Sequence, residues 1–383
     1  MNELNLNSDV PPPQLLEDIV RSALEHGATD VHLEQNADGL EVSFRLDGRL
    51  KGVGKVGPPA SERIPTLVKY MAKLKTYLHR QPQDGEINGE QFGFGGRIRA
   101  SVYPTVDGEK VALRIFDEHQ RRFELTELNF PNDYLEALKK QLAHPEGLLL
   151  FTGPAGSGKT TTIYSSLSYV LQQGRTNILT IEDPVEARLP GITQTAVDRA
   201  VGLDFPQALR SLLRQDPEVI AVGEIRDDTT ARITLRAAFT GHLGLSAIHA
   251  GSAVSVFARL LEMRIEPFLL TSALRLVTAQ RLLRKLCPEC EGKGCENCLQ
   301  SGYKGRLPLV EYVVVDEDVR ERVKNYSSEK ELLEFLIDEK VFRPLIMRAK
   351  DLIKAGKTDM AEVQRVLGPE SVTSDLQDDN DMS

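Results

Sequence analysis

A glycine-rich loop between an apolar run and a helix-prone run constrains this chain more than any other segment. The loop reads Gly153-Pro-Ala-Gly-Ser-Gly-Lys-Thr160, and it follows the apolar run Leu148-Leu-Leu-Phe151. It matches G-x-x-x-x-G-K-[ST], in which backbone N–H groups and the start of the next helix surround phosphate oxygens. Glycines allow that close approach because they carry no β-carbon. The pattern therefore predicts a nucleotide-phosphate site in an α/β fold.

Two side chains of this loop have expected roles of their own. Lys159 is expected to reach the β- and γ-phosphates of ATP, and the Thr160 hydroxyl is expected to bind Mg²⁺, which prefers oxygen ligands. The alternative is an ordinary glycine-rich turn between a strand and a helix, which the Lys-Thr pair in register disfavours. The loop residues that we expect to contact ATP are Gly153, Pro154, Ala155, Gly156, Ser157, Gly158, Lys159, Thr160 and Thr161.

Length and charge limit the remaining possibilities. A chain of 383 residues predicts two or three domains, and its 41% hydrophobic and 27% charged residues are typical of soluble globular proteins. The net charge of -9 disfavours nucleic acid as a partner, because phosphate backbones require a local excess of Lys and Arg. Neither a signal peptide nor an apolar run of about 18 residues is recognisable, so we expect a cytoplasmic location.

The region before the loop reads as a small α+β domain over residues 12–117. It combines expected helices with runs that alternate apolar and polar residues, as in antiparallel strands. The charged segment that follows is either a linker or a solvated face, and residues 118–139 are interpreted as a linker and a lead-in helix. The expected helices are 14–25 and 61–79, and the expected strands are 30–34, 40–46, 97–103 and 111–116.

After the loop, strands and helices alternate, which predicts a parallel sheet with helices on its faces. The expected strands are 148–151, 177–181, 219–222 and 243–248, and the expected helices are 205–215 and 229–239. Ligands of such sheets bind at the carboxyl ends of the strands. The residues that follow these strands, and so become candidate site residues, are Glu182, Asp183, Glu224 and His249.

Glu224 stands where a nucleotide hydrolase places the carboxylate that orients and deprotonates the attacking water. The preceding position, often an aspartate that supports Mg²⁺, is Gly223. More of the work of positioning the metal then falls to Thr160 and to Glu182 or Asp183. The alternatives are that Glu224 caps the next turn through Arg226 or Asp227, and that Glu182-Asp183-Pro184 is only a turn.

Two histidines bracket the last of these strands. His242 and His249 are seven residues apart, so strand alternation points them to opposite faces, and they cannot both bind one atom. Position at the carboxyl edge favours a hydrogen-bond donor to the γ-phosphate, and the alternative is a structural histidine.

All four cysteines lie close together near residue 290. Cys287-Pro-Glu-Cys290 and Cys295-Glu-Asn-Cys298 are two C-x-x-C pairs, each able to bring two thiolates to one tetrahedral Zn²⁺. Four thiolates leave no open position, so the predicted site is structural. A redox pair is the alternative, but no thioredoxin-like context surrounds it.

The end of the chain reads as helices followed by a polar segment. The expected helices are 329–337, 342–355 and 358–366, and residues 369–383 are acidic and predicted to be disordered.

Taken together, the motifs resemble those of the secretion ATPase superfamily, in its type II secretion and type IV pilus assembly branch. The resemblance covers residues from about 14 to 315. The segments that carry it are the loop, Ile181–Glu186, Leu209–Pro217, Val222–Asp227, Thr240–His249 and Ala279–Leu283.

That resemblance implies a hexameric motor that couples ATP hydrolysis to secretion or pilus assembly. It implies a PAS-like amino-terminal domain and a RecA-like ATPase domain over residues 140–368, with the zinc element at 287–306. It assigns Glu182 and Asp183 to an Asp box, Glu224 to a Walker B motif, His242 and His249 to a His box, and Arg99 and Arg114 to phosphate contacts. For the two arginines the alternative is an outward salt bridge.

The resemblance also implies partners. These are an inner-membrane platform protein and, indirectly, a pilin or pseudopilin, at the cytoplasmic face of the inner membrane. The chain departs from the family at Ala250 and Gly251, where the His box usually continues Thr-Asn, and it resembles a short form without the first amino-terminal domain. A retraction motor and a nucleotide-gated scaffold with little turnover remain the alternatives.

Overall fold

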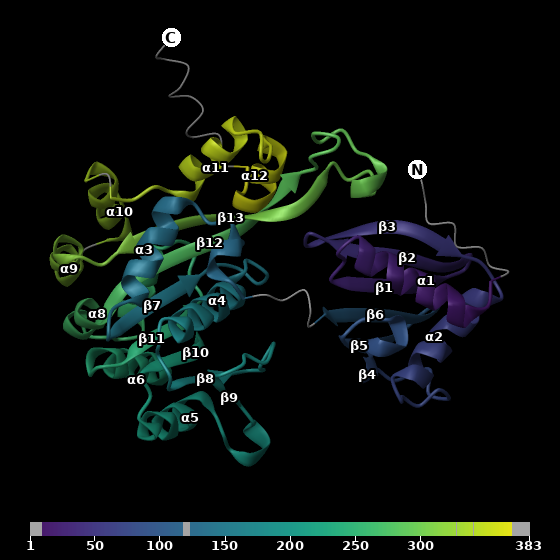
Figure 1. The fold of residues 1–383 in the computed structure, drawn as a ribbon, viewed down its shortest axis with the longest axis horizontal. Helices are drawn as coiled ribbons and strands as arrows, with labels where there is room; N and C mark the ends of the chain where they lie inside the picture. The colour runs from purple at the N-terminus through teal and green to yellow at the C-terminus, as the bar shows by residue number, and fades with distance from the viewer. Residues whose placement is uncertain (1–9, 118–122, 327, 340, 370–383) are drawn as a thin grey trace, which may run out of the picture. The chain divides into compact units, whose positions relative to one another are not determined.

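The computed structural model describes residues 10–117, 123–326, 328–339 and 341–369 (Figure 1). The described residues form two compact units, one from the ranges 1–122 and 284–306 and one from the ranges 123–283 and 307–383. The cysteine segment therefore groups with the amino-terminal unit and not, as predicted, with the ATPase domain. The reason is packing, since Leu299 contacts the hydrophobic core of the amino-terminal unit. Residues 118–122 of the predicted linker and lead-in helix (118–139), and residues 370–383 of the predicted tail (369–383), lie outside the described residues.

Within residues 10–117, the amino-terminal unit is an antiparallel sheet that packs against two helices. The strand order is β3-β2-β1-β6-β5-β4, and each neighbouring pair is antiparallel. The apolar stripe of the first helix is buried against this sheet, as its spacing predicts. The elements are α1 (Pro12–Glu25), β1 (Asp30–Asn36), β2 (Gly39–Leu46), β3 (Arg49–Val56), α2 (Ala60–Met71), β4 (Gln83–Asn88), β5 (Gly96–Thr105) and β6 (Gly108–Asp117).

Two features of this unit differ from the prediction. The second helix ends at Met71, since the chain turns at Lys73 with a left-handed φ of 57°, so the predicted helix over 72–79 is wrong. Strands β3 and β4 were not predicted, because Gly52 and Gly54 interrupt the alternation of β3 and Gly85 lies within β4.

The second unit is built on a sheet of order β13-β12-β7-β11-β10-β8-β9. All the neighbouring pairs from β12 to β9 are parallel, which confirms the predicted parallel sheet. Its strands are β7 (Gly147–Thr152), β8 (Ile178–Glu182), β9 (Thr193–Ala196), β10 (Val219–Ile225), β11 (Leu243–Ile248), β12 (Leu274–Leu286) and β13 (Tyr303–Val314). Its helices are α3 (Asn132–Leu142), α4 (Lys159–Gln172), α5 (Phe205–Leu212), α6 (Asp228–Phe239), α7 (Ser255–Glu262), α8 (Pro267–Ala273), α9 (Glu317–Lys324), α10 (Glu329–Asp338), α11 (Leu345–Lys354) and α12 (Met360–Leu367).

Helices cover both faces of this sheet. Leu148 and Leu150 of β7 pack into one hydrophobic core with α6 to α8, and Leu149 and Phe151 pack into a second core with α3 and α4. Every residue of β7, β8 and β11 is buried, as expected for central parallel strands. Because β7 is buried along its whole length, the position of the glycine-rich loop that begins directly after it is fixed relative to the sheet.

The predicted carboxyl-terminal helices correspond to α10, α11 and α12. The middle one begins at Leu345 and not at 342, because Pro344 occupies its N-cap. Helices α11 and α12 share a small core with Leu283 of β12 and Leu309 of β13. Across the described residues, no helix is both long enough and apolar enough to cross a bilayer.

Candidate active site

The glycine-rich loop joins β7 to α4 and packs against β12. A β-carbon at Gly153 would lie 2.3 Å from the Gln280 carbonyl oxygen, and one at Gly158 would lie 2.7 Å from the Gln280 side-chain nitrogen. These glycines are thus required by contact with β12 and not only by a ligand. The loop residues that remain exposed are Pro154, Ala155, Gly156, Thr160 and Thr161. One side of the loop is therefore anchored, and the other is open at the N-terminus of α4.

Lys159 carries the positive charge of this loop. Its Nζ donates to the carbonyl oxygens of Gly153 at 2.7 Å and Pro154 at 2.9 Å. Burial lowers the pKa of Lys159, and the nearby Glu224 carboxylate opposes that shift. Ser157 Oγ is buried and has no hydrogen-bond partner within the described residues. An ammonium beside a helix N-terminus suits a phosphate, so these residues fit a nucleotide.

A cavity of about 330 Å³ adjoins the loop, at the carboxyl edge of the sheet. Its volume is at the small end for ligand pockets. The loop borders it on one side, and the ends of β8, β10 and β11 border it on the other. The predicted site residues that line it are Ala155, Gly156, Lys159, Thr160, Glu182, Asp183, Glu224 and His249.

Glu224 and His249 meet at the ends of two adjacent strands. The Nε2 atom of His249 lies 3.1 Å from Glu224 Oε2, and Arg226 donates to Glu224 Oε1. Burial acts to raise the pKa of Glu224, but the hydrogen bonds and charges of Arg226 and His249 outweigh it, so the pKa is lowered. Glu224 is therefore a carboxylate able to accept a hydrogen bond from water. Asp227 instead caps α6 through the Thr230 N–H.

The position before Glu224 is Gly223 and not the usual aspartate, and the structure leaves little space for a side chain there. The register of β10 against β11 shifts between Val222 and Glu224, which marks a β-bulge. A β-carbon at Gly223 would lie 3.2 Å from the Ile181 carbonyl oxygen and 3.4 Å from Glu182 Cα. An aspartate would require the neighbouring strand β8 to move.

Glu182 lines the cavity but is held by three donors. Thr180 Oγ1 donates to Oε1 at 2.5 Å, Gln194 Nε2 donates to Oε1 at 3.0 Å, and the Tyr164 hydroxyl donates to Oε2. Burial and the Glu182 carboxylate raise the pKa of Tyr164. The hydrogen bonds of Glu182 are thus largely taken up within the protein.

Asp183, the next residue, is the more accessible carboxylate at this edge. Among the described residues Asp183 makes one ion pair, with Arg199, at 3.1 Å between Oδ2 and a guanidinium nitrogen, and Arg199 is exposed. Asp183 and Thr160 both line the cavity, so two oxygen ligands of the kind that Mg²⁺ prefers border it.

The structure does not bring His242 into this cavity. His242 precedes β11 and His249 follows it, so the strand separates them by roughly 20 Å at about 3.3 Å per residue. The Nδ1 atom of His242 lies 3.0 Å from the Ala237 carbonyl oxygen near the end of α6. His242 is therefore removed from the predicted set for this cavity, because it lies at the opposite edge of the sheet.

In the amino-terminal unit, Arg99 and Arg114 are direct cross-strand neighbours on β5 and β6, and both are exposed. Arg114 Nε donates to Asp30 Oδ1 at 2.9 Å, so this arginine makes the salt bridge that was the alternative. Arg99 makes no ion pair with any residue that the structure describes. Two cations side by side are unfavourable unless an anion joins them.

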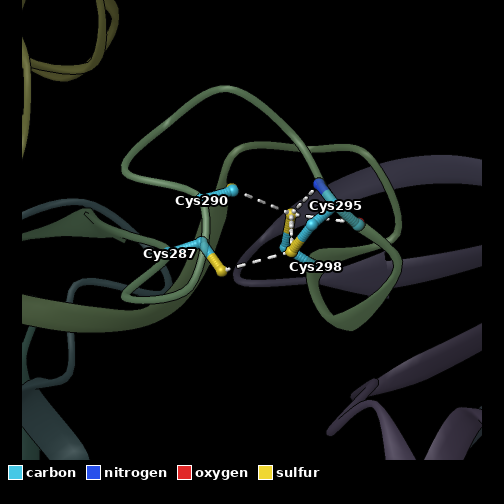
Figure 2. A group of neighbouring side chains, drawn as sticks. All are labelled: Cys287, Cys290, Cys295 and Cys298. Atoms are coloured by element: carbon cyan, nitrogen blue, oxygen red, sulfur yellow. Dashed lines mark hydrogen bonds between the residues drawn. The ribbon is translucent and has the colours of Figure 1, made fainter.

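The four cysteines converge, as Figure 2 shows, with Cys287 and Cys290 facing Cys295 and Cys298. Their sulfurs all lie within 4.8 Å of one another, and three of the distances are 3.7 to 3.8 Å. A tetrahedron with Zn–S bonds of about 2.3 Å has edges of about 3.8 Å. Gly292 and Gly294, with φ near 90°, close the short loop between the pairs. The cluster is therefore compatible with zinc.

Sequence reasoning missed several residues that support the site. Tyr164 is four residues after Thr160, so helical spacing places both on one face of α4 and was a usable signal. Thr180 is two residues before Glu182 on one strand face, which was a second signal. Gln194 and Gln280 lie on β9 and β12, which were not predicted.

Comparison with known proteins places these features in a family. The sequence matches the family model described as type II/IV secretion system protein over residues 5–365. It is 40% identical over 349 residues to type II secretion system protein E of Pseudomonas aeruginosa, covering 85% of this chain and 69% of that protein. It is 36% identical over 392 residues to type II secretion system ATPase E of Vibrio cholerae, covering 95% and 76%. It is 40% identical over 357 residues to type IV pilus assembly ATPase PilB of Myxococcus xanthus, covering 85% and 62%.

The fold is likewise similar to solved structures. The crystal structure of the pilus retraction motor PilT with bound ADP has a TM-score of 0.64 and 26% identity, covering 91% of this chain and 96% of that chain. The Legionella pneumophila ATPase DotB has a TM-score of 0.70 at 20% identity, covering 94% and 98%, which is a likeness of fold alone. The chain belongs to the type II/IV secretion system protein family and has its α/β ATPase fold.

Proposed function

We propose that this chain hydrolyses ATP to ADP and phosphate at the cavity beside the loop. The observation that carries the proposal is that Lys159 and Thr160, at the N-terminus of α4, line the same cavity as the Glu224–His249 pair. The loop would hold the phosphates, and Glu224 would orient the attacking water and accept its proton. His249 would hold Glu224 in place and donate a hydrogen bond toward the γ-phosphate.

Thr160 and Asp183 would hold Mg²⁺, which would neutralise charge on the phosphate oxygens. Glu182 has a different role in this proposal. Because three donors from the protein occupy it, Glu182 would fix the end of β8 and hence Asp183, and would not itself act on water.

We extend the proposal to a motor, because relatives are named as type II secretion and type IV pilus assembly proteins. The chain would act as a homo-hexamer at the cytoplasmic face of the inner membrane, on a platform protein of that membrane. Pilins or pseudopilins would be moved through this partner. Arg99 and Arg114, in a PAS-like unit, would supply charge to phosphates within the ring.

We also propose that the cysteine cluster holds one structural Zn²⁺. The sulfur spacing supports this, and four thiolates would leave no position for a reacting molecule. The ion would fix the segment that connects β12 to β13.

The deciding experiment is steady-state phosphate release with Mg²⁺-ATP, compared between the wild type and Glu224→Gln. We expect a loss of about 10²- to 10⁴-fold with nucleotide binding retained, because only proton transfer and water positioning are removed. Lys159→Ala should weaken ATP binding itself. Equal rates in the wild type and Glu224→Gln would reject the catalytic assignment and favour a nucleotide-gated scaffold.

A further inference from the structure

The segment that carries His249 is tied to the sheet by its backbone. Residues 249–253, here named the His249 loop, follow β11. Thr152 at the end of β7 both donates to the Ala250 carbonyl oxygen and accepts from the Ala250 N–H, each at 2.8 Å. Arg281 of β12 donates to the Gly251 carbonyl oxygen at 2.8 Å. Ala250 and Gly251 have no side chain that could make a hydrogen bond, so the loop is held through their backbone N–H and carbonyl groups instead.

A third tie comes from Glu311 of β13, and it reaches further. Glu311 is only 4% exposed, and its Oε1 accepts from the Ala253 N–H at 2.8 Å. Its Oε2 accepts from the Leu345 N–H at 3.0 Å. Ala253 lies just before α7, and Leu345 is the first residue of α11, whose N-cap Pro344 supplies no side-chain cap. One carboxylate therefore joins two helix N-termini.

The surroundings make both bonds of Glu311 necessary. Burial raises the pKa of Glu311. The hydrogen bonds from the Ala253 and Leu345 N–H groups and the charges of Arg281 and Arg348 lower it, but burial has the larger effect. A carboxylate at this depth is tolerated only when its oxygens are hydrogen-bonded. An amide in its place has one acceptor oxygen and one donor NH₂, so it can satisfy only one of the two N–H groups.

We propose that Glu311 is a positioning residue that locks the His249 loop to α11. When His249 shifts as the γ-phosphate binds or leaves, the carboxyl-terminal helices would then shift with it. The nucleotide-dependent part rests on the proposed function. The lock itself is a property of this chain's own hydrogen bonds. Helices α11 and α12 share a hydrophobic core with β12 and β13, so a shift at the N-terminus of α11 would move both helices together.

The first test needs no activity. Hydrogen exchange is measured in the full chain for peptides covering residues 249–257 and 344–350, in the wild type and in Glu311→Gln. We expect exchange to become about tenfold faster in both peptides, because the amide releases one N–H group and weakens the link to the other. Glu321→Gln, at an exposed position on α9, is the matched control and should change neither peptide. Unchanged exchange in either peptide of Glu311→Gln would overturn the lock.

The second test separates a positioning role from a merely structural one. Glu311→Gln should lower kcat for ATP about tenfold and leave KM within about twofold, since the binding loop is untouched. In a His249→Ala background the same substitution should cause no further loss, because Glu311 acts through His249. Additive losses would overturn the positioning role. If the wild type hydrolyses no ATP, the proposed function fails, while the exchange comparison still decides the lock.

Discussion

His249 Nε2 lies 3.1 Å from Glu224 Oε2, although 25 positions separate the two residues in the chain. Adjacent parallel strands β10 and β11 end at the same edge of the sheet, and the bulge at Gly223 sets the level of Glu224. The carboxylate thus gains a fixed partner on its side of the cavity. A fixed orientation is what positioning of an attacking water requires.

Removing the His249 ring should slow hydrolysis without weakening binding. We expect His249→Ala to lower kcat on the order of 100-fold, because one hydrogen-bond donor in the site is lost. His242→Ala is the matched variant. It should lower the melting temperature, because the hydrogen bond to the Ala237 carbonyl oxygen is lost, while kcat of the folded protein changes little. Phosphate release and thermal melts of both variants check this. Equal kcat losses would contradict the placement of His242 outside the cavity.

Arg226 should control the acid limb of the pH profile. Its hydrogen bond and charge help to lower the pKa of Glu224 against the effect of burial. In Arg226→Gln the pKa of Glu224 rises, so on acidification hydrolysis is lost at a higher pH than in the wild type. Arg199→Gln, which removes a cation paired with Asp183, should leave the limb in place. An acid limb that stays still or moves to lower pH in Arg226→Gln would refute this account.

The Tyr164 hydroxyl should contribute to stability through Glu182. Tyr164→Phe removes a buried donor to a carboxylate, so the free energy of unfolding should fall by about 1–2 kcal/mol in urea titrations. Tyr169→Phe, on the same helix and without a hydroxyl hydrogen bond among the described residues, should change it by less than about 0.5 kcal/mol. A similar loss in both variants would mean that the ring and not the hydroxyl is responsible.

The cysteine cluster should contain zinc as purified. Elemental analysis of protein made without added zinc should give about one equivalent per chain, and a variant with both Cys290→Ser and Cys295→Ser should give none. If instead the wild type contains no zinc and its thiols cycle between reduced and disulfide-bonded forms, the redox alternative is correct.

Arg99 should act on turnover more than on binding. Arg99→Ala should lower ATP hydrolysis by roughly 10-fold or more while nucleotide affinity stays within about twofold, because its charge is needed as phosphate is transferred. Arg97→Ala, an exposed arginine on the same strand that already pairs with Glu86, is the control. Unaltered turnover in Arg99→Ala would remove Arg99 from the proposed site.

Part of the site could be predicted because its signals are local. A strand, a glycine-rich loop and a helix lie together in the sequence, so the position of Lys159 follows from a short pattern. Glu182, Glu224 and His249 each follow an apolar strand, and the carboxyl ends of parallel strands share one edge. The structure places all three beside one cavity.

The misses share a different cause. Strands β12 and β13 have polar residues among their apolar ones, so no regular alternation predicts them from the sequence. Strand β12 nevertheless pairs with β7 and places Gln280 and Arg281 beside the glycine-rich loop. The family resemblance assigned His242 and His249 to one His box, but the extended strand β11 between them places His242 away from the cavity.

The sequence alone therefore determined the phosphate loop, the parallel direction of the central strands and the cysteine pairs, since each follows from a short local pattern or from the alternation of strands and helices along the chain. Only the tertiary structure decided that Glu182 is held by Tyr164, that His242 lies at the far edge, and that Glu311 joins two helices. Those contacts depend on which distant strands pair and in which register, and the pairing is set by burial of the whole sheet and not by any local pattern.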